Sequence, residues 1–210
     1  RIVSPEGTHE EIDSSVVIDA TGQQSLIAHR LGIRNEDPNM RKSSIWTYYQ
    51  GAERDPGIDA GATIILLTEN KQAWFWFIPL SGDITSIGVV GNSDYLFKGR
   101  GKPATIFEEE LRRCPALSER LVAACRSEDF HVAREFSYKA SQAAGDGWVL
   151  VGDAYGFIDP VYSSGVYFAL KTAELAADCV IEGLRQNDTS ANQLGSWAEQ
   201  FDAAANLVRK

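Results

Sequence analysis

Residues 148–154 read Trp-Val-Leu-Val-Gly-Asp-Ala, and they point to the fold class of this chain. Four apolar residues in a row, ended by a glycine and an aspartate, are typical of a buried strand that runs into a ligand-binding loop. In open α/β sheets, ligands lie beyond the carboxyl ends of the strands, which is where Asp153 is expected. From Gly165 to Leu184, apolar residues recur at helical spacing and predict one long helix. A strand, a glycine turn and a helix make up one unit of an α/β fold.

A second pattern of strand, turn and helix opens the chain. Residues 15–19, Ser-Val-Val-Ile-Asp, are a β-branched run that ends at Ala20-Thr21-Gly22. The helical pattern that starts at Ser25 is expected to stop at Gly32. The chain begins at Arg1 without a methionine and inside a strand-forming region, so we expect the natural N-terminus to lie further upstream.

The middle of the chain has a different pattern. Apolar runs separated by turns rich in Asp, Pro and Gly predict strands at 44–49, 63–67, 73–78 and 85–90. The short connections between these strands favour an antiparallel sheet. Helices are expected at 105–113, 116–126 and 191–208, with Pro115 separating the first two. The predicted fold class is therefore α/β at both ends of the chain, with an α+β portion built on the antiparallel sheet inserted between them.

The composition is that of a globular protein without nucleic-acid or membrane signals. The 210 residues carry a net charge of −9, and no run of Lys and Arg exceeds two residues, which argues against binding to nucleic acid or to an anionic membrane surface. No apolar stretch approaches the roughly 18–20 residues of a membrane span, so we expect no stable membrane anchor. The three cysteines are widely spaced without a C-x-x-C pair, so we expect a cytoplasmic protein with neither a metal site nor a disulfide framework.

Two groups of residues after the 148–151 strand have the chemistry of a cofactor site. The carboxylate of Asp153 can accept hydrogen bonds from the hydroxyls of a ribose or ribityl chain. The residues Ser163-Ser164-Gly165-Val166 start the long helix, and the first amides of a helix lack internal partners and carry about half a positive charge. Such amides would stabilise an anionic reduced flavin or a small anion such as chloride, with Gly165 allowing close approach. The alternative is an ordinary turn followed by a helix that Ser164 caps.

Residues 74–79, Trp-Phe-Trp-Phe-Ile-Pro, are the third notable stretch. On a strand, the two tryptophans and the isoleucine point to one face of the sheet and the two phenylalanines to the other. The proline lacks an amide donor and is expected to end the strand. With aromatic residues on both faces, either both faces are buried or one of them lines an apolar cavity, and plain core packing is the commoner fate of such side chains.

In their order along the chain, these stretches resemble the flavin-dependent halogenases, which belong to the aromatic-hydroxylase-like flavoproteins. The matching residues are Asp19-Ala20-Thr21-Gly22, then Trp74-x-Trp76-x-Ile78-Pro79, then Gly152-Asp153-Ala154 with Phe157-Ile158-Asp159-Pro160 and Ser163-Ser164-Gly165-Val166. The resemblance runs from Val16 to Leu184. The Gly-Asp stretch is typical of the wider superfamily, whereas the Trp-x-Trp-x-Ile-Pro stretch is much more specific.

The resemblance implies FAD as the cofactor, bound by residues that follow the strands and start the long helix: Gly22, Gly152, Asp153, Pro160, Ser164, Gly165 and Val166. Asp153 would contact the ribityl chain. Ser164 and Gly165 would also frame the halide, chloride or bromide. Trp74 and Trp76 would separate the flavin from the substrate, which disfavours direct monooxygenation. In the family, the halide is oxidised with reduced FAD and O2 to hypohalous acid, which travels to an electron-rich substrate.

The chain departs from the family pattern in two respects. The Gly-x-Gly-x-x-Gly turn and the lysine that handles hypohalous acid have no counterpart in this fragment, so the catalytic lysine is not among its residues. Tyr162 stands where halogenases of free tryptophan have a glutamate. The implied substrate is therefore phenol- or pyrrole-like, including substrates tethered to a carrier protein. A flavin reductase is implied as the partner that supplies reduced FAD.

The implied architecture is a truncated aromatic-hydroxylase-like flavoprotein fold. Residues 1–40 and 141–185 would be the remaining part of the FAD-binding α/β domain, residues 41–140 the substrate domain, and residues 186–210 the start of a C-terminal helical region. We expect this fragment to be inactive alone. Two other functions stay open: an FAD-dependent aromatic monooxygenase or polyprenyl reductase on the same scaffold, and a binding domain without catalytic activity.

Overall fold

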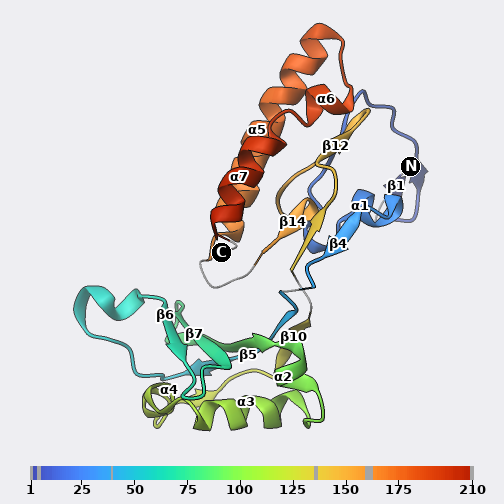
Figure 1. Cartoon of the computed structure of the whole chain (residues 1–210). Helices are drawn as coiled ribbons and strands as arrows, with labels where there is room; N and C mark the ends of the chain where they lie inside the picture. Colours follow the sequence, from blue (N-terminus) through green and yellow to red (C-terminus); the bar gives the residue numbers. More distant parts are fainter. Residues whose placement is uncertain (1, 4–5, 39, 135–136, 159–162, 209–210) are drawn as a thin grey trace. The chain divides into compact units, whose positions relative to one another are not determined.

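The computed structural model describes residues 2–3, 6–38, 40–134, 137–158 and 163–208. The chain divides into two compact units, of which unit 1 consists of Arg1–Asn35 and Tyr138–Lys210 and unit 2 of Glu36–Ser137 (Figure 1). Unit 2 is one continuous segment inserted between the two segments of unit 1. The predicted fold class, α/β with an inserted antiparallel sheet, is confirmed.

The central sheet of unit 1 has three strands in the order β12–β13–β3. Strand β13 (Trp148–Leu150) pairs in parallel with β3 (Val17–Asp19) and antiparallel with β12 (Ala144–Gly145). Because β3 and β13 run in the same direction, the loops that follow them, from Ala20 and from Val151, leave the sheet at the same edge. The fold therefore brings together the two strand-end loops that the sequence singles out.

Unit 1 contains two further sheets. One has three strands in the order β14–β11–β4, and the other consists of β1 and β2. Their strands are β1 (Ile2–Val3), β2 (His9–Glu10), β4 (Arg34–Glu36), β11 (Tyr138–Ala140) and β14 (Gly156–Phe157). Strand β11 carries the buried Tyr138, which contacts the loop after β13.

The helical elements of unit 1 are η1 (Gly22–Gln24), α1 (Leu26–Leu31), η3 (Gly152–Ala154), α5 (Gly165–Gln186), α6 (Ala191–Leu194) and α7 (Ala198–Val208). The long helix predicted from Gly165 is confirmed, and it extends to Gln186. Helix α1 ends at Gly32 as predicted, because Gly32 adopts a left-handed φ of +66° that suits a glycine.

The prediction of one continuous helix over 191–208 is wrong, because α6 and α7 are separated at Gly195. A Cβ atom on Gly195 would lie 2.8 Å from the carbonyl oxygen of Ala191 and 3.3 Å from the Cβ of Ala144 on β12. The chain therefore turns where only a glycine fits against the sheet. The break lets Leu194 and Trp197 both enter the core of unit 1, where they are buried.

Unit 2 is built on a six-stranded antiparallel sheet in which β10, β5, β8, β7 and β6 follow one another and β9 pairs with the other end of β5. The strands are β5 (Lys42–Gln50), β6 (Ile64–Leu67), β7 (Ala73–Pro79), β8 (Ile84–Asn92), β9 (Cys125–Arg126) and β10 (His131–Arg134). The four strands predicted for this region are confirmed, and β7 ends at the predicted proline, Pro79.

The helical elements of unit 2 are α2 (Ser93–Phe97), α3 (Pro103–Arg112), α4 (Pro115–Arg120) and η2 (Gly57–Gly61). The helix predicted over 116–126 is wrong in its second half, since α4 ends at Arg120 and Cys125–Arg126 form β9. Strand β9 pairs with Tyr49–Gln50 at the end of β5. The backbone groups at this end of β5 need partners, and strand pairing satisfies them at the expense of the helix.

The sheet of unit 2 has two chemically different faces. On the core face, Phe75 and Phe77 are fully buried, and the Phe75 ring lies 5.5 Å from the Phe107 ring of α3. Figure 1 shows α3 running along this side of the sheet. On the opposite face, here called the aromatic face, Trp74 and Trp76 are half-buried. The predicted alternation of side chains along this strand is thus confirmed.

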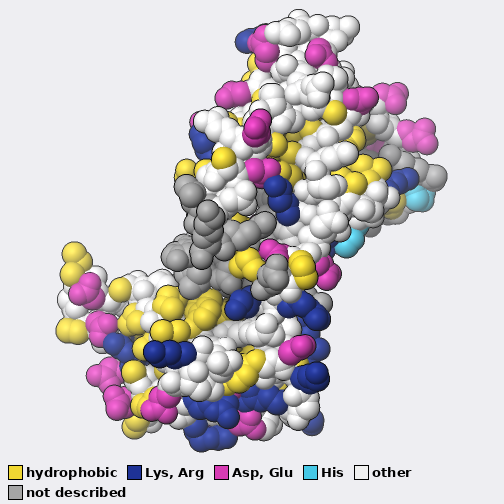
Figure 2. Space-filling view, viewed as in Figure 1, with side chains coloured by type: hydrophobic (Ala, Val, Ile, Leu, Met, Phe, Trp, Pro, Cys, Tyr) yellow, Lys and Arg dark blue, Asp and Glu magenta, His cyan; other side chains and the backbone are white. Residues whose placement is uncertain are grey.

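Charged side chains are spread unevenly over the surface. In Figure 2, Lys and Arg side chains gather over unit 2 around α3. Lys98, Lys102 and Arg112 are exposed members of α3 and of the loop before it. Within the ranges that the structure describes, no helix combines the length and the apolar character needed to cross a membrane.

Candidate cofactor site

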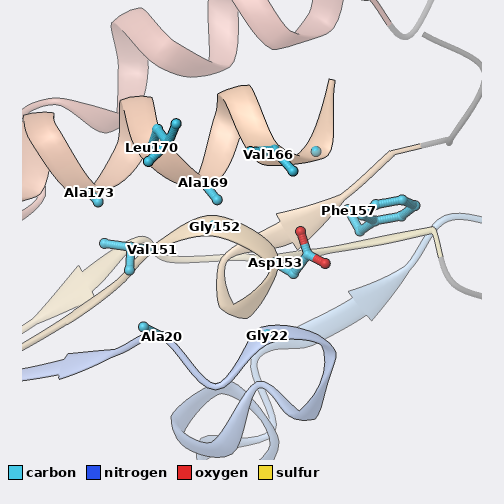
Figure 3. A pocket seen from close by; sticks show the side chains of 11 residues that line it. Ala20, Gly22, Val151, Gly152, Asp153, Phe157, Val166, Ala169, Leu170 and Ala173 are labelled. Atoms are coloured by element: carbon cyan, nitrogen blue, oxygen red, sulfur yellow. The ribbon is translucent and has the colours of Figure 1, made fainter. Parts of the chain in front are cut away.

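A cavity of about 570 Å³ lies at the carboxyl ends of β3 and β13 in unit 1 (Figure 3). Its walls come from the loops after these strands, from β14 and from the first turns of α5: Ala20, Gly22, Val151, Gly152, Asp153, Phe157, Gly165, Val166, Ala169, Leu170 and Ala173. Among these described lining residues, Asp153 has the only ionisable side chain. The described part of the lining is thus apolar with one carboxylate, a combination that suits a ring system carrying a hydroxylated chain.

The lining residues come from three separate parts of unit 1. In Figure 3, Ala20 and Gly22 lie on one side of the cavity, and Ala169 and Val166 point toward it from α5 on the other, with Asp153 between them. The lining residues of α5 recur at helical spacing, so they occupy one face of the helix. The small side chains on this face allow α5 to approach the loop after β13 closely.

The turn that carries Asp153 is held by hydrogen bonds on two sides. The Gly152 amide donates to the Thr172 hydroxyl at 2.8 Å, and this hydroxyl donates in turn to the Phe168 carbonyl at 2.8 Å. On the other side, the Tyr138 hydroxyl donates to the Asp153 carbonyl at 2.6 Å. Thr172 and Tyr138 are both buried, and close packing restricts their rotamers. The backbone of the turn is therefore fixed while the Asp153 side chain projects from it.

The Asp153 carboxylate is half-buried, and none of the described residues compensates its charge. Burial raises the pKa of Asp153 above its ordinary value of 3.8, and no charge or hydrogen bond from a described residue opposes this effect. A half-buried carboxylate without donors is unfavourable for the fold, because the water lost on burial is not replaced. Ligand hydroxyl groups would supply the missing donors, so the site fits the hydroxylated chain of a flavin cofactor.

The other strand-end carboxylate, Asp19, is used by the fold instead. It is buried and accepts hydrogen bonds from the Thr21 amide at 3.0 Å, the Thr21 hydroxyl at 2.7 Å and the Ile27 amide at 2.7 Å. Ile27 lies in the first turn of α1, so Asp19 satisfies an amide that has no partner within the helix. Asp19 is therefore a structural residue, and the chain after it contributes Ala20 and Gly22 to the cavity.

The start of α5 forms part of the cavity wall. Gly165 and Val166, two of the residues predicted to contact the cofactor, line the cavity. Ser164 occupies the N-cap position, as the alternative of an ordinary turn and capped helix expects, but its side chain makes no capping hydrogen bond. This hydroxyl therefore leaves the first amides of α5 to other partners. Pro160 and Tyr162 lie outside the described residues.

Trp74 and Trp76 belong to unit 2, where they form part of the aromatic face. Their ring centroids are 6.3 Å apart, and the Trp76 ring lies 6.3 Å from that of Trp46 on β5. The Nε1–H group of Trp76 donates to the Ser86 hydroxyl on β8 at 3.1 Å. Both ring distances fall within the range of favourable aromatic pairs, so the three indoles make one continuous surface.

Several residues that shape the cavity are not among the predicted site residues. Ala169 and Ala173 could have been predicted, since small residues recur on one face of the helix after Gly165. The sequence indicates Thr172 more weakly, because a threonine inside a helix often bonds to a backbone carbonyl or a tertiary partner. No sequence pattern indicates Tyr138, since its hydroxyl contacts the Asp153 carbonyl only in the folded protein.

Gly152→Ala is expected to lower the free energy of unfolding by about 1–3 kcal/mol. Gly152 has a left-handed φ of +56°, and an added Cβ would lie 3.1 Å from the Cβ of Ala169 on α5. Gly32→Ala is the matched control, since Gly32 has a φ of +66° and nothing within 4 Å of an added Cβ. Denaturant unfolding compares the two variants. Equal losses would show that the contact with α5 adds nothing to the backbone strain.

Comparison with known proteins places this geometry in a family. A family model described as tryptophan halogenase matches residues 3–209. The 1H-pyrrole-2-carbonyl peptidyl-carrier-protein chlorinase of Pseudomonas fluorescens is 32% identical over 190 residues, which are 86% of this chain and 41% of that protein. The corresponding brominase of Pseudoalteromonas luteoviolacea is 31% identical over 215 residues, which are 99% of this chain and 52% of that protein.

Solved structures agree with the sequence relatives. The structure of the flavin-dependent brominase Bmp2 matches with a TM-score of 0.88 and 29% identity, over 97% of this chain and 51% of that one. The flavin-dependent halogenase CmlS matches with a TM-score of 0.81 and 27% identity, over 90% of this chain and 34% of that one. The chain spans about half the length, or less, of the relatives it matches.

Proposed function

The chain belongs to the tryptophan halogenase family, and on that premise we propose that the whole protein is a flavin-dependent halogenase that uses reduced FAD, O2 and chloride or bromide. The observation that carries this proposal is the Asp153 carboxylate, which is half-buried without a donor from the described residues in a cavity at the carboxyl ends of two parallel strands. Dinucleotides bind at this edge of α/β sheets, and the flavin side chain offers the hydroxyl donors that Asp153 lacks.

The residues around the cavity have distinct roles in this proposal. Asp153 would accept hydrogen bonds from the ribityl hydroxyls of FAD, and Gly22 and Gly152 would let the backbone approach the cofactor. Ser164, Gly165, Val166 and, by resemblance, Pro160 would border the flavin ring and the halide. Helix amides favour negative charge, which suits both a reduced flavin and a halide ion. Bound reduced FAD would supply the electrons that activate O2 for oxidation of the halide.

Trp74 and Trp76 would keep the flavin and the substrate apart. Two half-buried indoles offer a wide, rigid apolar wall at low cost in conformational entropy. Oxidised halogen, rather than oxygen from the flavin, would then reach the substrate ring. In this scheme the two tryptophans transfer neither electrons nor protons. They only keep the substrate from reaching the flavin.

We propose an electron-rich, pyrrole- or phenol-like substrate, presented on a carrier protein. The support comes from two relatives named as halogenases of carrier-bound 1H-pyrrole-2-carbonyl groups. Tyr162, in place of the glutamate of free-tryptophan halogenases, argues in the same direction. A separate flavin reductase would supply reduced FAD.

The test is product analysis with the whole protein, reduced FAD, O2 and a carrier-bound pyrrole-2-carbonyl substrate, with and without bromide. Mass spectrometry should show a brominated product only when bromide is present. A hydroxylated product that forms regardless of halide would instead assign an aromatic monooxygenase on the same scaffold. A reduced substrate without either modification would assign a reductase.

Trp76→Ala is expected to raise the yield of hydrogen peroxide or hydroxylated product relative to halogenated product, by roughly tenfold if the loss of a packed indole costs the barrier a little over 1 kcal/mol. Removing the ring opens the wall between cofactor and substrate. Trp76→Phe is the control, because it keeps an aromatic ring in the same place. Peroxide and both products are quantified per FAD oxidised. A Trp76→Ala protein with the parent ratio would refute the barrier role.

A further inference from the structure

Strand β8 holds the Trp76 indole in one orientation. We propose that Ser86 and Gly88 on this strand are positioning residues, which fix the Trp76 ring in the orientation that separates the flavin from the substrate. This inference rests on the proposed barrier role of Trp76. Neither residue belongs to the motif that contains Trp76, and both lie on the neighbouring strand.

Gly88 provides the floor on which the indole lies. It is the direct cross-strand partner of Trp76 on one side and of Trp46 on the other. A Cβ atom on Gly88 would lie 2.2 Å from Cζ2 of Trp76 and 2.5 Å from its Cε2 and Cη2 atoms. The six-membered ring therefore occupies the space that any other residue at this position would need for its side chain. Gly88 lets Trp76 lie down across the sheet, toward Trp46.

Ser86 fixes the rotation of the ring. Its hydroxyl, which is buried, accepts the Nε1–H group of Trp76 at 3.1 Å. A tryptophan side chain offers one donor and no acceptor, so this bond satisfies the whole hydrogen-bonding capacity of the indole. The polar atom of Trp76 is consequently engaged by the sheet. The barrier presents ring carbon, and it has no free N–H group to hold a halide or an oxidised halogen.

The aromatic face supports this orientation from the sides. One row of the sheet runs from His131 on β10 through Trp46 on β5 and Gly88 on β8 to Trp76 on β7. The His131 and Trp46 rings stack at 5.3 Å, and the next ring along the row is that of Trp76. Trp74 lies beside Trp76 on the same strand. Gly88 is the one member of this row without a side chain, and the Trp76 ring occupies the space above it.

Two substitutions in the whole protein separate this role from general stability. Ser86→Ala removes the acceptor, and Gly88→Ala displaces the ring without removing any atom of Trp76. We expect each variant to raise the hydrogen-exchange rate of the Trp76 Nε1–H group about fivefold and the ratio of peroxide to halogenated product roughly two- to tenfold, as for the loss of one hydrogen bond. The exchange signal is assigned by its absence in Trp76→Phe. Ser86→Thr, which keeps the hydroxyl, should restore both values.

Matched controls come from other parts of the chain. Ser44→Ala removes another buried serine from the aromatic face, on β5. Gly145→Ala disturbs the same kind of pair in unit 1, where an added Cβ would lie 2.4 Å from the ring of its cross-strand partner Trp148. Both controls should keep the parent product ratio, and a change equal to that of Gly88→Ala would overturn the inference.

The remaining outcomes separate the inference from the function on which it rests. A raised ratio in Trp76→Ala beside parent values in Ser86→Ala and Gly88→Ala would overturn the positioning role alone. A parent ratio in Trp76→Ala would overturn the barrier role and the inference with it. The positioning role would be established if Ser86→Ala and Gly88→Ala both raise the exchange rate of the Trp76 Nε1–H group and the ratio of peroxide to halogenated product, while Ser86→Thr keeps the parent values.

Discussion

Asp153→Asn is expected to weaken FAD binding by the whole protein roughly ten- to a hundredfold while stabilising the unliganded protein at neutral pH. Hydrogen bonds to a charged group contribute about 1.5–3 kcal/mol, and the amide loses this charge. Without ligand, the carboxylate is half-buried with no described donor, and its ionised form disfavours folding. Quenching of flavin fluorescence measures affinity, and thermal unfolding measures stability.

The gain in stability should depend on pH in a defined direction. The folded protein raises the pKa of Asp153 above 3.8, so the folded state holds the proton more tightly than the unfolded chain. The stability associated with this group is therefore complete below 3.8 and is lost as the pH rises through the raised pKa. The advantage of Asp153→Asn should appear above that raised pKa and vanish in acid.

Asp19→Asn provides the control for this experiment. Asp19 follows the neighbouring parallel strand, but its carboxylate accepts hydrogen bonds from Thr21 and Ile27. The same substitution there should lower stability rather than raise it. If Asp153→Asn binds FAD as tightly as the parent, the role of this carboxylate in the cofactor site is refuted.

Glu110→Ala is expected to lower the free energy of unfolding of unit 2 by about 3–5 kcal/mol, the cost of breaking a buried ion pair. The Glu110 side chain on α3 is fully buried and accepts from Arg100 at 2.7 Å and from Arg113 at 2.5 Å. Its carboxylate also accepts from the Tyr95 hydroxyl at 2.9 Å. Removing Glu110 leaves the Arg100 guanidinium, whose side chain is 16% exposed, paired with the more exposed Glu109.

Glu109→Ala is the matched control for this prediction. Glu109 is the next residue on α3 and also pairs with Arg100, but its side chain is 36% exposed, so solvent screens the pair. Its loss should lower stability much less than the loss of Glu110. The denaturation midpoint at an unchanged slope gives both values. Similar losses in the two variants would mean that burial does not decide the strength of this network.

The sequence predicts those parts of the fold that depend on local pattern. The strand and turn at 148–154, the helix from Gly165 and the alternation of the 74–79 strand all depend on residues close together in the chain, so they are confirmed. The two wrong helices depend on distant partners. Residues 125–126 leave the helical pattern to pair with β5, and Gly195 ends α6 because β12 packs against it.

The candidate site divides in the same way. Asp153 is predictable because a polar residue directly after a buried strand lies at the ligand-binding edge of the sheet. Thr172 and Tyr138, which hold its turn, come from elements far away in sequence, and only the fold shows their contacts. The orientation of Trp76 is a similar case. The alternation gives the face on which it lies, whereas Gly88 and Ser86 set its position through the register of β7 and β8.

The insertion of unit 2 affects the order in which parts of the chain fold during synthesis. During synthesis, β3 leaves the ribosome before unit 2, and its parallel partner β13 follows after it. The large apolar cluster of unit 2 consists of residues of unit 2 alone, so this unit can fold while β3 still lacks its partner β13. The longer tether adds little to the equilibrium cost, about 0.6 kcal/mol per doubling of loop length. The delay is kinetic, and the pairing of β3 with β13 is expected to be the late step at which newborn chains are most prone to aggregate.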